Sequence, residues 1–132
     1  MSSEYTVLLY SDDPVVRDRM RLAIGTRPRA DQEVEFVDAS TYKECVSLID
    51  TYEIDLVVLD GEAAPAGGLG ISRQLHDELT DVPTVCVYIA RAADRWLAAY
   101  AKADATLLHP LDPITTAAAV SDLLDKRKAL TA

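Results

Sequence analysis

Short apolar runs alternate with amphipathic segments along the chain. The runs are rich in Val, Leu and Ile and are bounded by polar residues or Pro, which is typical of buried parallel strands. The segments between them repeat apolar residues at spacings of three and four, as helices that pack on a sheet do. We predict strands at Tyr5–Tyr10, Val34–Val37, Asp55–Leu59, Thr84–Ile89 and Ala105–Leu108.

Helix start signals follow three of these strands. Asp13-Pro14 and Asp112-Pro113 each combine an N-cap residue with proline at the first helical position, and Ser40 or Thr41 can cap a helix between them. The faces of the last two predicted helices contain Trp96, Leu97 and Tyr100, and then Ile114, Ala117, Ala118 and Leu124.

This regular alternation predicts an α/β fold of the (βα)5 type, a doubly wound, five-stranded parallel sheet with helices on both faces. At 132 residues the chain is expected to form one domain over residues 1–132. In such sheets, ligands bind beyond the carboxyl ends of the strands.

Polar residues stand at these strand ends. Ser11-Asp12-Asp13 follows the first strand, Asp60 the third and His109 the fifth. If the first and third strands are neighbours, Asp12 and Asp60 converge, and their mutual repulsion favours a cation between them. Mg²⁺ is a suitable cation, and it could shield a phosphoryl group that Asp60 attacks as a nucleophile.

Each residue also has an ordinary structural interpretation. Asp13 can be only a helix cap, and Asp12 a solvated acid. Asp60, which precedes Gly61, can be a turn residue, and His109 can form a hydrogen bond within a loop. The functional hypothesis therefore depends on several strand ends meeting at one place.

Along nearly its whole length, the sequence resembles the receiver (CheY-like) domain of response regulators. The matching segments are Val7–Asp13 with Arg17, Asp55–Asp60, Gly68-Leu69 and Ala103–Pro110. The resemblance implies a flavodoxin/CheY-like fold with strand order 2-1-3-4-5. It also implies a role in two-component phosphorelay signal transduction.

The resemblance assigns roles to individual positions. Counting back from Arg17 places Asp12 on a metal-ligand position, and Asp60 is the phosphoacceptor and also a metal ligand. Glu62 would offer its backbone carbonyl to Mg²⁺, and Asp13 is a further candidate ligand. The resemblance also implies a cis bond between His109 and Pro110.

Four positions depart from the family pattern. Ser11 replaces the first acid, His109 the lysine that grips the phosphoryl group, and Thr106 the aromatic switch residue. The switch threonine or serine aligns with Ile89, or with Tyr88 if the alignment shifts by one. A histidine of ordinary pKa is only about a tenth protonated near pH 7.5, so His109 would be a weaker substitute for lysine.

Charge and composition narrow the function. The net charge of −9 and the lack of a Lys/Arg stripe argue against nucleic-acid binding. No secretory signal or membrane span is visible, so we expect a cytoplasmic protein. Cys45 and Cys86 lie in apolar segments and are expected to be buried, reduced thiols.

Two functions stay open. In the first, the chain is a stand-alone atypical receiver and not an enzyme, and Asp60 accepts a phosphoryl group from a histidine kinase or another donor with Mg²⁺ bound. Output would pass to a protein partner through the helix 4–strand 5–helix 5 face, and a homodimer is a further option. In the second, a pseudo-receiver binds proteins without phosphorylation. A flavodoxin-like flavin site is disfavoured because the acidic Asp12-Asp13 pair would repel a phosphate.

Overall fold

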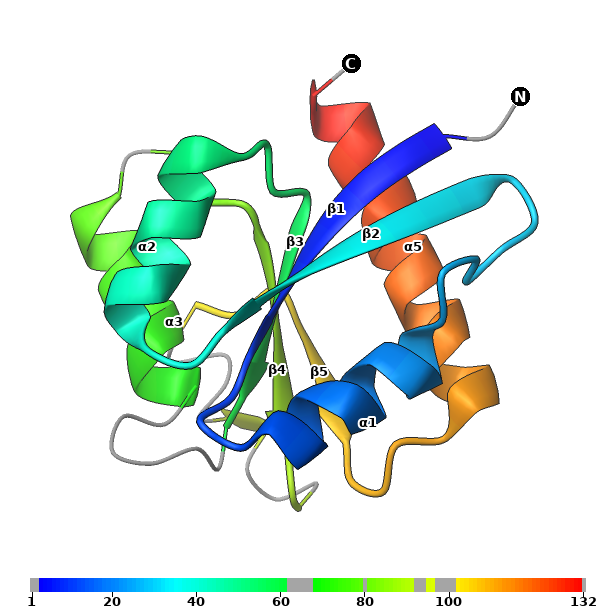
Figure 1. Ribbon diagram of the computed structural model, residues 1–132, viewed down its shortest axis with the longest axis horizontal. Helices are drawn as coiled ribbons and strands as arrows, with labels where there is room; N and C mark the ends of the chain where they lie inside the picture. The colour runs from blue at the N-terminus through cyan, green and yellow to red at the C-terminus, as the bar shows by residue number, and fades with distance from the viewer. Residues whose placement is uncertain (1–2, 62–67, 80, 92–94, 97–101, 132) are drawn as a thin grey trace.

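The computed structural model describes residues 3–61, 68–79, 81–91, 95–96 and 102–131. Its sheet has five parallel strands in the order β2-β1-β3-β4-β5, which confirms the predicted topology (Figure 1). The strands are β1 (Ser3–Tyr10), β2 (Gln32–Ala39), β3 (Leu56–Asp60), β4 (Thr84–Ile89) and β5 (Ala105–Leu108).

The helices that follow the strands are α1 (Pro14–Ile24), α2 (Tyr42–Thr51), α3 (Gly68–Glu78) and α5 (Pro113–Thr131). All three predicted caps form: Asp13 accepts a hydrogen bond from the Val15 amide at 2.9 Å, Thr41 accepts one from the Glu44 amide at 3.1 Å, and Asp112 accepts one from the Thr115 amide at 3.2 Å. Helix α1 stops at Gly25, whose φ of 73° favours a residue without Cβ.

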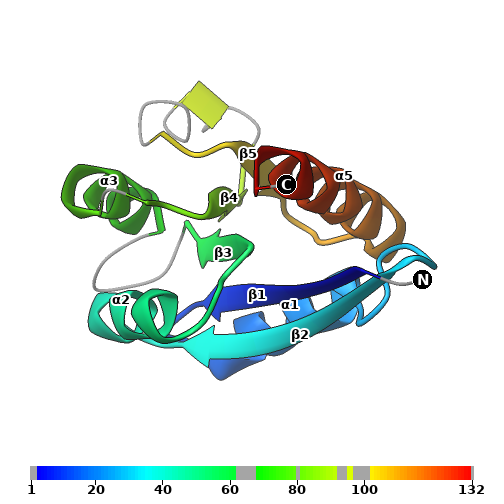
Figure 2. The same ribbon diagram turned by 90° about the horizontal axis from the view of Figure 1, so that it is seen from above.

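The helices cover the two faces of the sheet in pairs, with α2 and α3 on one side and α1 and α5 on the other (Figures 1 and 2). Because side chains alternate along a strand, β1, β2, β3 and β4 each contribute to two cores. The core beneath α1 and α5 contains Val7, Leu9, Leu56, Val58, Cys86, Leu107, Met20, Ile24, Val120 and Leu124. The core beneath α2 and α3 contains Leu8, Tyr10, Val57, Leu59, Val85, Val87, Ile89, Cys45, Ile71 and Leu75.

The strand predictions differ from the structure mainly at β2, which extends beyond Val34–Val37 at both ends. Its pairing with β1 runs in register from Ser3 and Gln32 to Tyr10 and Ala39. Glu33 and Asp38 in this extension lie on an edge strand and stay partly or fully exposed, and the added Gln32 is polar although buried, so an apolar pattern underestimates the length.

The predicted face of the last helix is wrong at its beginning. Ile114 is 81% exposed, and Ala118 is also exposed, whereas Thr116 and Val120 are buried. Ile114 therefore lies on the solvent side of the first turn of α5, whereas Thr116 in the same turn faces the interior. Of the residues predicted for the fourth helix, Leu97 and Tyr100 lie outside the described residues, and Trp96 is 67% exposed.

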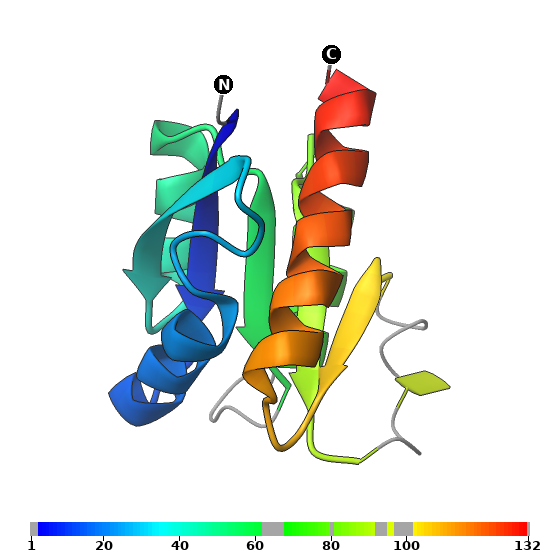
Figure 3. The ribbon, with the colours of Figure 1, turned by 90° about the vertical axis from the view of Figure 1, so that its right-hand side faces the viewer.

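All five strands point toward one end of the molecule, and both chain termini lie at the other end (Figure 3). The residues that follow the strands therefore gather away from the termini. No helix among the described residues has the length and apolar character needed to cross a membrane.

Candidate functional site

Asp60 ends the central strand β3 and is only 5% exposed. The hydroxyl of Ser11, the residue after β1, donates a hydrogen bond to Asp60 Oδ2 at 2.9 Å. Ser11 is fully buried, and its Oγ also accepts a hydrogen bond from the Asp13 amide at 3.0 Å. Because a buried carboxylate needs polar partners, this serine helps to hold Asp60 at the strand end.

Gly61 brings the end of β3 very close to β4. Its amide donates a hydrogen bond to the Tyr88 carbonyl oxygen at 2.7 Å. A Cβ at this position would lie 2.6 Å from the same oxygen, which is closer than real Cβ atoms approach. The glycine after Asp60 therefore lets the two strand ends meet.

Tyr88, rather than Ile89, lies on the same face of the sheet as Asp60. Asp60 and Tyr88 are partners in the register of β3 and β4, and Tyr88 packs against the core beneath α1 and α5. Ile89 is buried in the opposite core, beneath α2 and α3. The structure therefore does not bring Ile89 to the site. The alternative alignment, with the hydroxyl at Tyr88, agrees with the alternation of side chains along β4.

The Tyr88 hydroxyl and Nδ1 of His109 form a hydrogen bond between the ends of β4 and β5. The two ring centroids are 5.9 Å apart and the rings are tilted by 48°. His109 is exposed, but its backbone amide donates to the Ile89 carbonyl oxygen at 2.9 Å, which continues the strand pairing. The predicted cis bond between His109 and Pro110 is present.

Asp12 and Asp13 differ in what they contact. Asp13 caps α1, so one of its carboxylate oxygens is engaged in the way predicted for a cap. Asp12 is exposed at the end of the strand that pairs with β3. The pKa of Tyr10 is raised, mainly by burial and further by the charges of Cys45, Asp12 and Asp60. Asp12 and Asp60 thus both lie within electrostatic reach of one tyrosine.

Glu62 and Thr106 are the remaining predicted positions. Glu62, whose carbonyl was expected to bind metal, lies outside the described residues. Thr106 is half-buried and pairs in register with Val87, a residue of the core opposite Asp60. Among the described residues, no three His, Cys, Asp or Glu side chains gather as a metal site.

Comparison with curated proteins gives clear relatives. Two proteins described as uncharacterized response regulatory proteins, from two strains of Mycobacterium tuberculosis, are each 40% identical to this chain over 124 residues. Each match covers 93% of this chain and 93% of the relative. The chain belongs to the response regulators. No model of a known protein family matches it.

Solved structures show the same fold. A CheY-like receiver domain from Methanospirillum hungatei is 20% identical with a TM-score of 0.74, and the match covers 96% of this chain and 98% of that one. A LuxR-family response regulator from Aurantimonas is 24% identical with a TM-score of 0.77, covering 95% and 88%. At these identities, the likeness concerns the fold of a receiver domain.

Response regulators of this kind are signalling proteins of two-component systems, and they interact with histidine kinases and with downstream partners. Their receiver domains generally bind Mg²⁺ at the phosphorylation site. This receiver brings Ser11, Asp60, Tyr88 and His109 to one end and one face of its sheet. The sequence indicated three of these four positions directly, and Tyr88 as an alternative.

Proposed function

We propose that Asp60 is the phosphoacceptor of this receiver. Three features support the proposal: Asp60 ends the central strand, Ser11 holds its carboxylate by a hydrogen bond, and Tyr88 stands beside it on β4. A carboxylate oxygen of Asp60 would attack the phosphorus of a phosphohistidine or acyl phosphate, displacing the donor's imidazole or carboxylate. Water would later hydrolyse the acyl phosphate to inorganic phosphate and restore the carboxylate.

Mg²⁺ is the cation that suits the available ligands. Asp12 and Asp60 would supply carboxylate oxygens and Glu62 a backbone carbonyl, with waters as the remaining ligands, because Mg²⁺ often binds through only one or two carboxylates. When bound, the ion would neutralise charge on the phosphoryl oxygens. Since Ser11 stands where a further acid is usual, we expect weaker Mg²⁺ binding than in a receiver with both acids.

Tyr88 and His109 would contact the phosphoryl oxygens. Tyr88 would donate its hydroxyl in place of the usual threonine or serine, and His109 would take the place of lysine. These two side chains form a hydrogen bond with each other, and a phosphoryl oxygen would compete with that hydrogen bond. Phosphorylation would therefore exchange one hydrogen bond for others, and its free-energy gain would be smaller than with a permanently charged lysine.

Phosphate uptake tests this function. The protein is incubated with acetyl phosphate or phosphoramidate and Mg²⁺, and its intact mass is measured. We expect one phosphoryl adduct that Asp60→Asn abolishes and that Asp12→Ala or chelation of Mg²⁺ greatly reduces. Asp50→Asn, which removes an exposed acid from α2, should leave the adduct unchanged. An adduct that persists in Asp60→Asn would contradict the assignment.

The Ser11–Asp60 hydrogen bond also favours a second candidate function, a phosphorylation-independent interaction module. In that case, Ser11 rather than a metal ion would be what stabilises the buried carboxylate. The two functions differ in a direct way: the module would take up no phosphate from either donor, and it would bind its partner equally well as wild type and as Asp60→Asn.

The partners that we propose follow the family. A histidine kinase would be the phosphodonor, and the output face would include β5 and α5, where Leu108 is 37% exposed and Ile114 is 81% exposed. Apolar side chains exposed in this way suit a protein contact, either with a downstream partner or with a second copy of the chain.

A further inference from the structure

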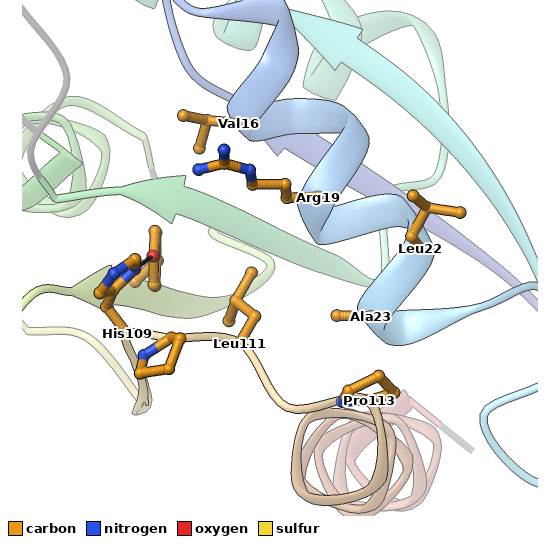
Figure 4. Close-up of a pocket in the computed structure, with 9 residues that line it drawn as sticks. Val16, Arg19, Leu22, Ala23, His109, Leu111 and Pro113 are labelled. Atoms are coloured by element: carbon orange, nitrogen blue, oxygen red, sulfur yellow. Dashed lines mark hydrogen bonds between the residues drawn. The ribbon is translucent and has the colours of Figure 1, made fainter.

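A pocket of about 330 Å³ lies between α1 and the segment that joins β5 to α5. Figure 4 shows Val16, Arg19, Leu22 and Ala23 on the α1 side, with His109, Leu111 and Pro113 on the other side. Asp60 is not among the lining residues, so this pocket is separate from the phosphoacceptor itself. The volume lies within the usual range of small-molecule sites, about 300–1,000 Å³.

The walls of the pocket are largely apolar. Val16, Leu22 and Ala23 come from α1, and Leu111 faces them from the β5–α5 segment. Leu22 is 80% exposed, although the other face of the same helix buries Met20 and Ile24. An apolar tail lying along Leu22 and Leu111 would remove this surface from water.

The polar side chains that line the pocket are those of Arg19, Tyr88 and His109. Arg19 makes no ion pair within the described chain, whereas Arg17 and Arg21 of the same helix both pair with Asp38. His109 bonds to Tyr88 through Nδ1, which leaves Nε2 without a partner among the described residues. Among the residues that the structure describes, no acidic side chain lines the pocket, in a protein whose net charge is −9.

We propose that this pocket binds a small amphipathic anion. Its oxyanion head group lies at Arg19 and His109, where a guanidinium provides charge-assisted hydrogen bonds, and its apolar tail lies along Leu22 and Leu111. This function goes beyond phosphotransfer and does not require Asp60 to be phosphorylated. Because Tyr88 and His109 border both sites, an occupant of the pocket contacts the pair that we assign to the phosphoryl group.

Octanoate, 1-octanol and octylamine provide matched probes, since they share a tail and differ in head-group charge. Binding is followed by ¹H–¹⁵N NMR titration of the full chain. We expect saturable binding of octanoate with shifts around Arg19, Leu22 and His109, and about tenfold weaker binding of octanol because the charged hydrogen bond is lost. Octylamine should bind most weakly.

Two variants locate the head and the tail. Arg19→Gln should weaken octanoate binding about tenfold while leaving octanol unchanged, and Leu22→Asp should abolish binding of both. Arg27→Gln is the control, since it removes the same charge from an exposed arginine that pairs with Glu33 outside the pocket. All three positions are exposed, so thermal unfolding should confirm that the variants fold.

Each result bears on the proposal. No saturable binding of octanoate, or binding that neither Arg19→Gln nor Leu22→Asp changes, would overturn it. A protein partner that occupies this face while octanoate does not would also overturn it. Asp60→Asn should bind octanoate like wild type, which keeps failure of this proposal separate from failure of the phosphoacceptor assignment.

Discussion

The two halves of the site are built differently. Ser11 and Asp60 are both buried, on adjacent central strands, and join through one hydrogen bond of 2.9 Å. Tyr88 and His109 join at the ends of β4 and β5, where His109 is exposed and β5 has only four residues. A hydrogen bond in the interior is costly to break, whereas an exposed one exchanges readily with water. The first half can therefore act as a fixed acceptor, and the second can rearrange.

The largest expected effect comes from adding a second acid beside Asp60. Ser11→Asp should lower the free energy of unfolding by about 3 kcal/mol in EDTA, because two buried carboxylates then face each other. Mg²⁺ should restore much of this loss. Urea denaturation with and without Mg²⁺ measures both quantities.

Ser11→Asn provides the neutral control for this change, because it adds a side chain of similar size without charge. Equal stability of Ser11→Asp and Ser11→Asn in EDTA would show that a carboxylate at position 11 is not repelled by the charge of Asp60.

A smaller effect is expected when the hydroxyl of Ser11 is simply removed. Ser11→Ala takes a hydrogen-bond donor from a buried carboxylate and should destabilise the protein by about 1–3 kcal/mol in urea denaturation. Ser47→Ala, on the exposed surface of α2, is the matched control and should change stability very little. If Ser11→Ala lowers the free energy of unfolding no more than Ser47→Ala does, the hydrogen bond in the buried half contributes no more to stability than an exposed group.

The exposed half should be less sensitive. Tyr88→Phe removes the hydroxyl that bonds to His109 and should cost about 0.5–1 kcal/mol, less than Ser11→Ala. A double-mutant cycle with His109→Ala isolates the coupling between the two side chains. A cost above that of Ser11→Ala would reverse the comparison.

The last effect concerns the core beneath both halves, and its size depends on pH. Burial raises the pKa of the Cys45 thiol to about 12 and that of the Cys86 thiol to about 12. In the unfolded chain a thiol titrates near pH 8.5. The stabilisation is therefore fully present below about pH 8.5 and is lost as the pH rises toward 12, because the unfolded state releases its protons first.

Urea denaturation at pH 7 and at pH 9.5 should show this decline, and thiol reagents should label the native protein slowly. Rapid labelling of Cys86, which lies two residues before Tyr88 on β4, would mean that the β4–β5 half opens more deeply than the structure indicates.

Much of the fold could be predicted because buried parallel strands have a simple apolar pattern, and β4 and β5 begin and end where the pattern places them. The residues of the site were harder to predict from the sequence. Ile89 and Tyr88 are adjacent, and an alignment shift of one residue moves a side chain to the other face of a strand. Only the register of Asp60 with Tyr88 distinguishes them.

Other features depend on three-dimensional placement that the sequence does not contain. The closeness of Gly61 to the Tyr88 carbonyl needs the pairing of β3 with β4. The exposure of Ile114 depends on which side of α5 faces the interior, since Thr116 in the same turn is buried. Likewise, the sequence around Arg17, Arg19 and Arg21 does not show which of these arginines form an ion pair. In the structure, Arg17 and Arg21 pair with Asp38.

A titration with beryllofluoride and Mg²⁺, followed by ¹H–¹⁵N NMR, tests the central claim most directly, because this complex imitates a phosphoryl group on aspartate. We predict saturable shifts at Ser11, Gly61, Tyr88 and His109 in the wild-type protein and none in Asp60→Asn. Unchanged spectra at saturating beryllofluoride and Mg²⁺, or equal shifts in Asp60→Asn, would contradict the account.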